Sequence, residues 1–89
     1  MPFVLVPEPY RGPTRGMGKI QVEANDVRGA LLAVEAAHPG FQELVLDADG
    51  GLHRFVKLFV NDEQIDRAAL DLPLGEEDHL GVLAAIAGG

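Results

Sequence analysis

Cysteine and tryptophan are both absent from the sequence, and no apolar run approaches the length needed to cross a membrane. Without cysteine, disulfides, thiolate metal sites and thiol nucleophiles are excluded. A membrane-spanning helix needs about 20 consecutive apolar residues, and residues 1–7 lack both the basic leader and the apolar length of a secretory signal. We therefore expect a cytoplasmic protein with no membrane partner.

Positive charge is also scarce, because 7 lysine and arginine residues stand against 14 aspartate and glutamate residues, for a formal net charge of -7. An anionic chain whose cations are scattered repels phosphate backbones and anionic lipids. We expect no nucleic-acid partner, and protein partners with basic docking surfaces. The 47% hydrophobic content and the length of 89 residues favour one folded domain with a modest core.

The first half of the chain predicts two strands joined by a loop. Residues 3–6 are a short apolar run between prolines, and residues 19–24 alternate polar and apolar side chains. Residues 7–18 between them are rich in proline and glycine, which interrupt helices and strands. We expect the two strands to pair with each other.

A helix pattern follows, with Asn25 or Asp26 as its expected N-cap. The spacing of its apolar residues predicts one buried stripe, made of Val27, Leu31, Val34 and His38. Pro39 and Gly40 predict its end, because proline disfavours helical geometry in the residue before it and glycine tolerates the exit.

The second half of the chain predicts mainly strands. Its strongest signal is residues 54–60, which are rich in β-branched and aromatic residues. A short helical turn is expected at 41–46, a tight turn at 61–63, a brief return strand at 64–65 and a final strand at 80–87.

Alternation along the last two long strands divides their side chains between two faces. If Val56 lies in the core, Phe55 and Phe59 point to the opposite face of the sheet. The same alternation in the final strand places Gly81 and Leu83 on that opposite face. Apolar side chains gathered on one uncovered face predict a docking surface for a partner protein.

The order strand, strand, helix, strand, short strand, strand predicts an α+β fold of the β-grasp, ubiquitin-like kind. Such a fold has a mixed sheet of four to five strands with one main helix packed across it. We expect the last strand to be central, and residues 1–89 to form a single domain in which residues 87–89 are a flexible C-terminal tail.

Three stretches resemble the MoaD/ThiS family of ubiquitin-like sulfur carrier proteins, and most closely its CysO-type carriers of cysteine biosynthesis. These stretches are residues 52–56, residues 59–63 and the run from the acidic turn through Leu80 to Gly88 and Gly89. The order of the predicted elements resembles that of the family over the whole chain.

This resemblance implies a role as a protein co-substrate and not as an enzyme. A partner of the ubiquitin-activating type, an adenylyltransferase, would use ATP to adenylate the carboxylate of Gly89. A sulfurtransferase would supply sulfur to form a thiocarboxylate, and a sulfur-accepting synthase would receive it. Gly88 and Gly89 lack a Cβ, so their backbone can approach a nucleotide closely. The chain itself would bind no cofactor.

The resemblance also implies that partners meet an apolar patch on the sheet together with the tail. The residues expected in this contact are Phe55, Phe59, Gly81, Leu83, Ile86 and Ala87.

Other functions remain open at this point. The chain could be the small subunit of a molybdopterin synthase, a carrier for thiamin synthesis or tRNA thiolation, a modifier joined through Gly89 to lysines of target proteins, or a plain interaction module. No convergent acid, base or nucleophile predicts an enzyme. The three histidines, His38, His53 and His79, have no metal-ligand spacing, so we expect no metal site.

Overall fold

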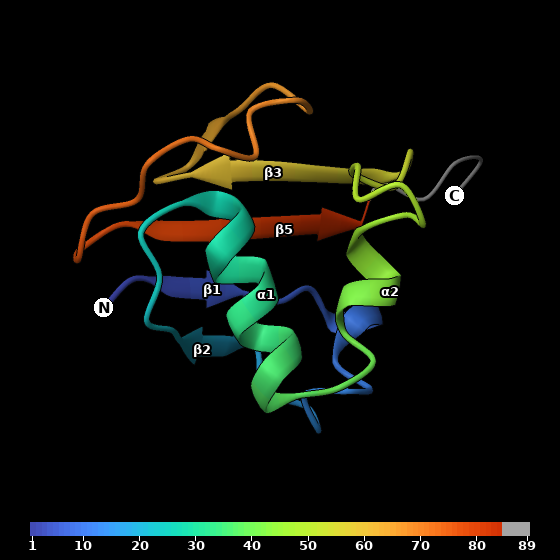
Figure 1. Cartoon of the computed structure of the whole chain (residues 1–89). Helices are drawn as coiled ribbons and strands as arrows, with labels where there is room; N and C mark the ends of the chain where they lie inside the picture. The colour runs from blue at the N-terminus through green and yellow to red at the C-terminus, as the bar shows by residue number, and fades with distance from the viewer. Residues whose placement is uncertain (85–89) are drawn as a thin grey trace.

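The computed structural model describes residues 1–84, and residues 85–89 lie outside the described part (Figure 1). The elements in chain order are β1 (Phe3–Leu5), the 3-10 helix η1 (Glu8–Tyr10), β2 (Lys19–Gln21), α1 (Val27–Ala37), α2 (Gln42–Val45), β3 (Val56–Val60), β4 (Glu63–Gln64) and β5 (His79–Ala84). The flexible tail predicted at 87–89 falls outside these residues.

The strands form one mixed sheet in the order β2-β1-β5-β3-β4, and α1 packs across one of its faces (Figure 1). β5 runs parallel to β1 and antiparallel to β3. The central position predicted for the last strand is therefore confirmed, and so is the α+β fold with one main helix.

The first three strands are shorter than their sequence patterns predicted, and the brief return strand expected at 64–65 is β4 at Glu63–Gln64. β1 and β2 pair over three residues each, with Val4 opposite Ile20. β3 begins at Val56 and not at Arg54, because Arg54 and Phe55 form a turn before it. A strand ends where its neighbour no longer provides backbone hydrogen-bond partners, and the pattern of side chains in the sequence does not predict that position.

Helix α1 begins at the N-cap Asp26, whose side chain accepts a hydrogen bond of 2.6 Å from the Gly29 N–H. This hydrogen bond identifies Asp26, and not Asn25, as the N-cap residue. The helix ends at Ala37, so the prediction that His38 belongs to its buried stripe was wrong. His38 is the half-buried C-cap, and Ala30 fills the buried face instead.

The core lies between α1 and one face of the sheet. Inward-facing strand residues alternate with outward ones, as sheet geometry requires. The buried strand residues are Val4, Ile20, Val56, Leu58, Leu80 and Val82, and the helical residues packed with them include Val27, Ala30, Leu31 and Val34. The connection between β4 and β5 adds Leu70 and Leu74 to this core.

The loop predicted at 7–18 contains η1 and is held by side-chain contacts. Thr14 is fully buried, and its hydroxyl donates to the Met17 carbonyl at 2.8 Å. Arg11 Nε donates to the Val6 carbonyl at 2.9 Å. A Cβ on Gly18 would lie 2.5 Å from Arg11 Nη2, so this position requires glycine or a displaced Arg11.

Within residues 1–84, no helix has the length and apolar character needed to cross a membrane. The same residues contain no group of three side chains that could hold a metal ion.

Candidate functional site

The face of the sheet opposite α1 is called the open face. Three of the predicted partner-binding residues, Phe59, Gly81 and Leu83, lie on it, and a fourth, Phe55, lies in the turn before β3. In β3, Val56 and Leu58 are buried, whereas Lys57 is exposed and Phe59 is half-buried. In β5, Leu80 and Val82 are buried and Leu83 is exposed. The two-face division predicted from alternation is therefore confirmed.

A row of paired residues crosses the middle of the open face. Leu5 of β1 pairs with Gly81 of β5, and Gly81 pairs with Phe59 of β3. A Cβ on Gly81 would lie 3.6 Å from Phe59 Cβ, in ordinary van der Waals contact. Gly81 therefore contributes no side chain between the two larger apolar residues that pair with it.

Leu83 extends this row toward the end of β5, and a further exposed apolar side chain lies in the turn before β3. Leu83 pairs across β5 and β3 with Lys57, and 45% of its surface is exposed. Phe55 is 43% exposed, but it lies in the turn before β3 and not in the strand as predicted. The Arg54 guanidinium lies 4.8 Å from the centroid of the Phe55 ring.

The other predicted site residues, Ile86, Ala87, Gly88 and Gly89, lie outside the described part of the chain. The description of β5 ends at Ala84, which pairs with Val56 at the start of β3. The start of β3 and the turn before it therefore lie beside Ala84, the residue after which the last five residues of the chain begin.

Arg67 holds that turn, and the sequence analysis missed it. Its guanidinium donates to the carbonyl oxygens of four residues at 2.7 to 3.5 Å. These residues are Leu52, His53, Arg54 and Val56. No short-range pattern links Arg67 to a turn 11 to 15 residues earlier in the chain, so only the tertiary structure reveals this contact.

The opposite end of the sheet is fastened by Asn61 and Asp78. Asn61 Nδ2 donates to Asp78 Oδ1 at 2.8 Å, and the His79 N–H donates to Asn61 Oδ1 at 3.0 Å. The Asn61 side chain first, and then the Gly75 N–H, hold the pKa of the Asp78 carboxyl below its usual range. Asn61 and Asp62 have φ of 50° and 71°, so the predicted tight turn uses left-handed backbone geometry.

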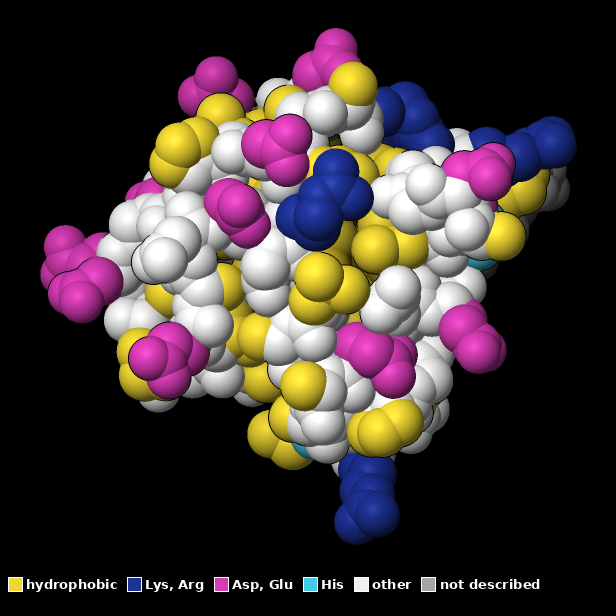
Figure 2. Space-filling model, viewed as in Figure 1, with side chains coloured by type: hydrophobic (Ala, Val, Ile, Leu, Met, Phe, Trp, Pro, Cys, Tyr) yellow, Lys and Arg dark blue, Asp and Glu magenta, His cyan; other side chains and the backbone are white. Residues whose placement is uncertain are grey.

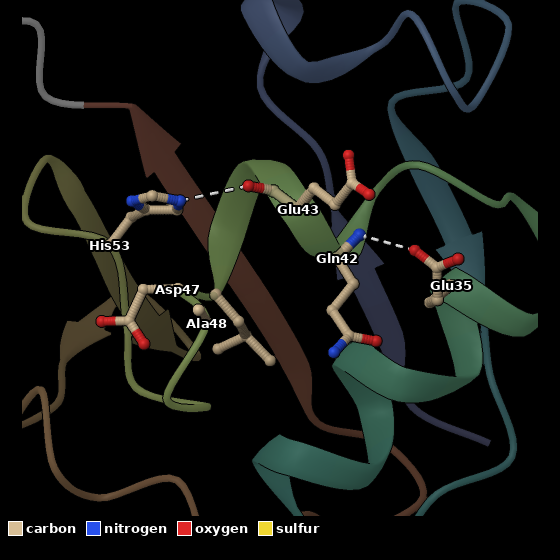
Figure 3. A pocket seen from close by; sticks show the side chains of 7 residues that line it. Glu35, Gln42, Glu43, Asp47, Ala48 and His53 are labelled. Carbon is tan, nitrogen blue, oxygen red and sulfur yellow. Dashed lines mark hydrogen bonds between the residues drawn. The ribbon is translucent and has the colours of Figure 1, made fainter.

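A surface pocket of about 530 Å³ lies beside the helices and not on the open face (Figure 3). Glu35 of α1, Glu43 of α2 and Asp47 contribute three carboxylates to its lining. Glu35 Oε1 accepts from the Gln42 N–H at 2.8 Å, and His53 Nε2 lies 3.1 Å from the Glu43 carbonyl oxygen. These contacts tie α1, α2 and the following turn together.

Curated relatives match the chain over nearly its full length. The sulfur carrier protein CysO of Mycobacterium tuberculosis H37Rv is 30% identical over 89 residues, which cover 97% of this chain and 96% of the relative. The sulfur carrier protein CysO of Mycobacterium bovis matches equally well. No protein-family model matches the sequence.

Solved structures match the fold over the same length. A chain in the crystal structure of the Amycolatopsis orientalis BexX/CysO complex has a TM-score of 0.90 and 29% identity, with 100% of both chains covered. The crystal structure of M. tuberculosis CysO has a TM-score of 0.87 and 27% identity, and covers 97% of this chain and 100% of its own. SAMP1 of Haloferax volcanii, at 24% identity and a TM-score of 0.82 with 99% of this chain and 98% of its own covered, shares the fold.

Proposed function

The chain belongs to the CysO type of the MoaD/ThiS family of ubiquitin-like sulfur carrier proteins, and from this premise we propose that it carries sulfur as a thiocarboxylate on Gly89. It acts as a co-substrate of other proteins and performs no catalysis itself. The match to sulfur carriers over 97% of the chain is the observation that carries the proposal.

The proposed chemistry has two steps. An oxygen of the Gly89 carboxylate attacks the α-phosphorus of ATP on a ubiquitin-activating-type adenylyltransferase, and pyrophosphate leaves. AMP is then the leaving group when a sulfurtransferase delivers the equivalent of hydrosulfide to the acyl carbon, and a thiocarboxylate results. The carboxylate needs this activation because it is a poor electrophile, whereas the acyl adenylate is a good one. ATP is thus a substrate of the partner enzyme.

The position of β5 supports this proposal. β5 is the central strand, and its last described residue, Ala84, is five residues before Gly89. Five residues span at most about 18 Å when fully extended. A tail of that reach allows an enzyme that docks on the body of the carrier to receive Gly88 and Gly89 in its active site.

The open face is the proposed docking surface for these partners. Phe59, Gly81 and Leu83 lie on it, and Phe55 lies in the turn before β3, which flanks the end of β5. The solved BexX/CysO complex supports protein binding, since a relative that is similar over its whole length binds a second protein. Ile86 and Ala87 are proposed to continue this contact into the tail.

Intact-protein mass spectrometry tests the proposal. The chain is incubated with the activating enzyme of its own host, ATP and a sulfur donor, and the expected product carries one sulfur in place of one oxygen at its C-terminus. A variant that lacks Gly89 should give no such product, while its fold stays unchanged by circular dichroism. Absence of the product from the wild type under these conditions would contradict the proposal.

Cysteine biosynthesis is the proposed destination of the sulfur, on the strength of the CysO relatives. The thiocarboxylate form is offered separately to a pyridoxal-phosphate-dependent, cysteine-synthase-like enzyme and to the large subunit of a molybdopterin synthase. We expect loss of sulfur from the carrier only with the first. Transfer to the second alone would reassign the pathway and leave the carrier chemistry intact.

A further inference from the structure

We propose that the open face selects a partner surface that is apolar at its centre and carries carboxylates at its rim, and that Lys19 and Lys57 make this selection. The inference deepens the proposed function and rests on it, because it specifies the chemistry of the partner that docks there. It also differs from the basic partner surface that the net charge of -7 predicts.

The charges of the chain are divided unevenly between the two faces of the sheet. The strand positions that point away from α1 are Phe3, Leu5, Lys19, Gln21, Lys57, Phe59, Gln64, His79, Gly81 and Leu83. None of the 14 acidic residues occupies one of these positions, whereas both lysines of the sequence do. The helix-covered face instead has Asp and Glu side chains spread over it (Figure 2).

Each lysine lies beside the apolar row. Lys19 pairs with Leu5 across β2 and β1, and its ammonium lies 4.2 Å from the centroid of the Phe3 ring. Lys57 pairs with the exposed Leu83. A partner that covers Leu5 and Leu83 therefore also covers part of the two lysine side chains that are paired with them.

Within the described residues, neither ammonium forms an ion pair. Among residues 1–84, the two ion pairs formed are Arg28 with Asp71 and His79 with Asp62, and neither includes a lysine. Asp62 lies beside His79 at the start of β5, away from Leu83 near the other end of that strand.

Desolvation determines what the partner must provide. Covering a cation without giving it a hydrogen-bond acceptor is unfavourable, and a like charge opposite the cation adds repulsion. An apolar partner surface lined by carboxylates covers the row and also pairs with the lysines. Long-range attraction from the net charge does not decide this contact, because salt screens charges beyond about 8 Å at physiological ionic strength.

The test measures affinity for the activating enzyme of the same host at low and high salt. The variants are Lys57→Glu and Lys19→Glu, and Arg15→Glu is the matched control because it changes the net charge equally on an exposed loop. We expect each lysine variant to bind about tenfold more weakly at low salt, with the difference shrinking at high salt. Arg15→Glu should change the affinity less than about twofold.

Three outcomes would overturn the inference: unchanged binding by the lysine variants, tighter binding by them, or an equal loss in Arg15→Glu. The variant Leu83→Asp distinguishes failure of the charge selection from failure of the proposed docking surface. If Leu83→Asp abolishes binding while the lysine variants bind normally, the docking surface stands and the charge selection fails. Urea unfolding of every variant checks that each is folded.

A second measurement does not depend on the enzyme. Amide chemical shifts of the labelled chain are recorded with a synthetic Leu/Glu peptide and with a Leu/Lys peptide of the same length. We expect the Leu/Glu peptide to shift amides around Lys57, Phe59 and Leu83. Shifts there from the Leu/Lys peptide alone, or from neither, would contradict the inference even if the activating enzyme proved to be the wrong partner.

Discussion

The two faces of the sheet are built by the same strands but carry different chemistry. On the inner face, Leu80 and Val82 of β5 are buried under α1 together with Leu58 of β3. On the open face, Leu83 and Phe59 come from the same two strands and keep contact with solvent. Both faces are rich in apolar residues, so apolar character alone does not distinguish the core from a docking surface.

The covering helix makes the difference. α1 lies over one face (Figure 1), and its buried residues complete the core there. The open face has an apolar centre with lysines beside it, and acidic residues are excluded from its strand positions. An apolar centre with a charged rim is the general anatomy of a protein interface.

The largest effect on stability is expected from replacing a leucine on the inner face by alanine, compared with the same replacement on the open face. Leu80→Ala removes a fully buried side chain and should lower the free energy of unfolding by about 2–5 kcal/mol. Leu83→Ala removes one that is 45% exposed and should change it by about 0.5 kcal/mol or less. Urea unfolding measures both. Equal losses would mean that the open face is part of the stabilising core.

Arg67→Gln should lower stability by about 1.5–3 kcal/mol, the net contribution typical of hydrogen bonds to a charged group. Glutamine cannot reach the four carbonyls that the guanidinium bonds in the turn before β3. Hydrogen exchange should accelerate at Val56, whose N–H bonds the His53 carbonyl in that turn. Arg67→Lys should retain only part of the stability and of the exchange protection that Arg67 provides. Unchanged exchange at Val56 would show that the turn holds without Arg67.

Asp26→Ala should destabilise the covering helix by about 1 kcal/mol, since it removes the N-cap acceptor of the Gly29 N–H. Thermal unfolding measures the loss. Asn25→Ala is the matched control, because Asp26 is the cap that the structure identifies. A larger loss in the control would mean that the cap has been assigned to the wrong residue.

The smallest effect on stability is expected from lowering the pH, which protonates Asp78 at one end of the sheet. Its folded-state pKa is lowered, first by the Asn61 side chain and then by the Gly75 N–H. Its contribution to stability is therefore complete above the unfolded-state pKa and is lost as the pH falls through the folded-state pKa. Asp78→Asn should lose less stability than the wild type between about pH 5 and pH 3. Parallel losses would show that Asp78 does not contribute.

The sequence predicted much of the fold correctly, and it also predicted the face of the sheet on which Phe59, Gly81 and Leu83 lie. Alternation at 56–60 and 80–84 separates core residues from open-face residues, because a strand has a fixed period of two. The same reasoning fails at Phe55, where the strand has not yet begun. The helical spacing fails at His38, because α1 ends at Ala37, one residue before it.

What the sequence determined by itself is the local periodicity: which residues alternate, where Asn and Asp cap or turn, and which composition interrupts an element. These follow from short-range sterics and hydrogen bonding, and neighbouring residues set both. Only the tertiary structure decided that Arg67 holds the turn before β3, and that Leu5, Gly81 and Phe59 lie side by side across three strands. Such contacts depend on strand order and register, which bring together residues far apart in the chain.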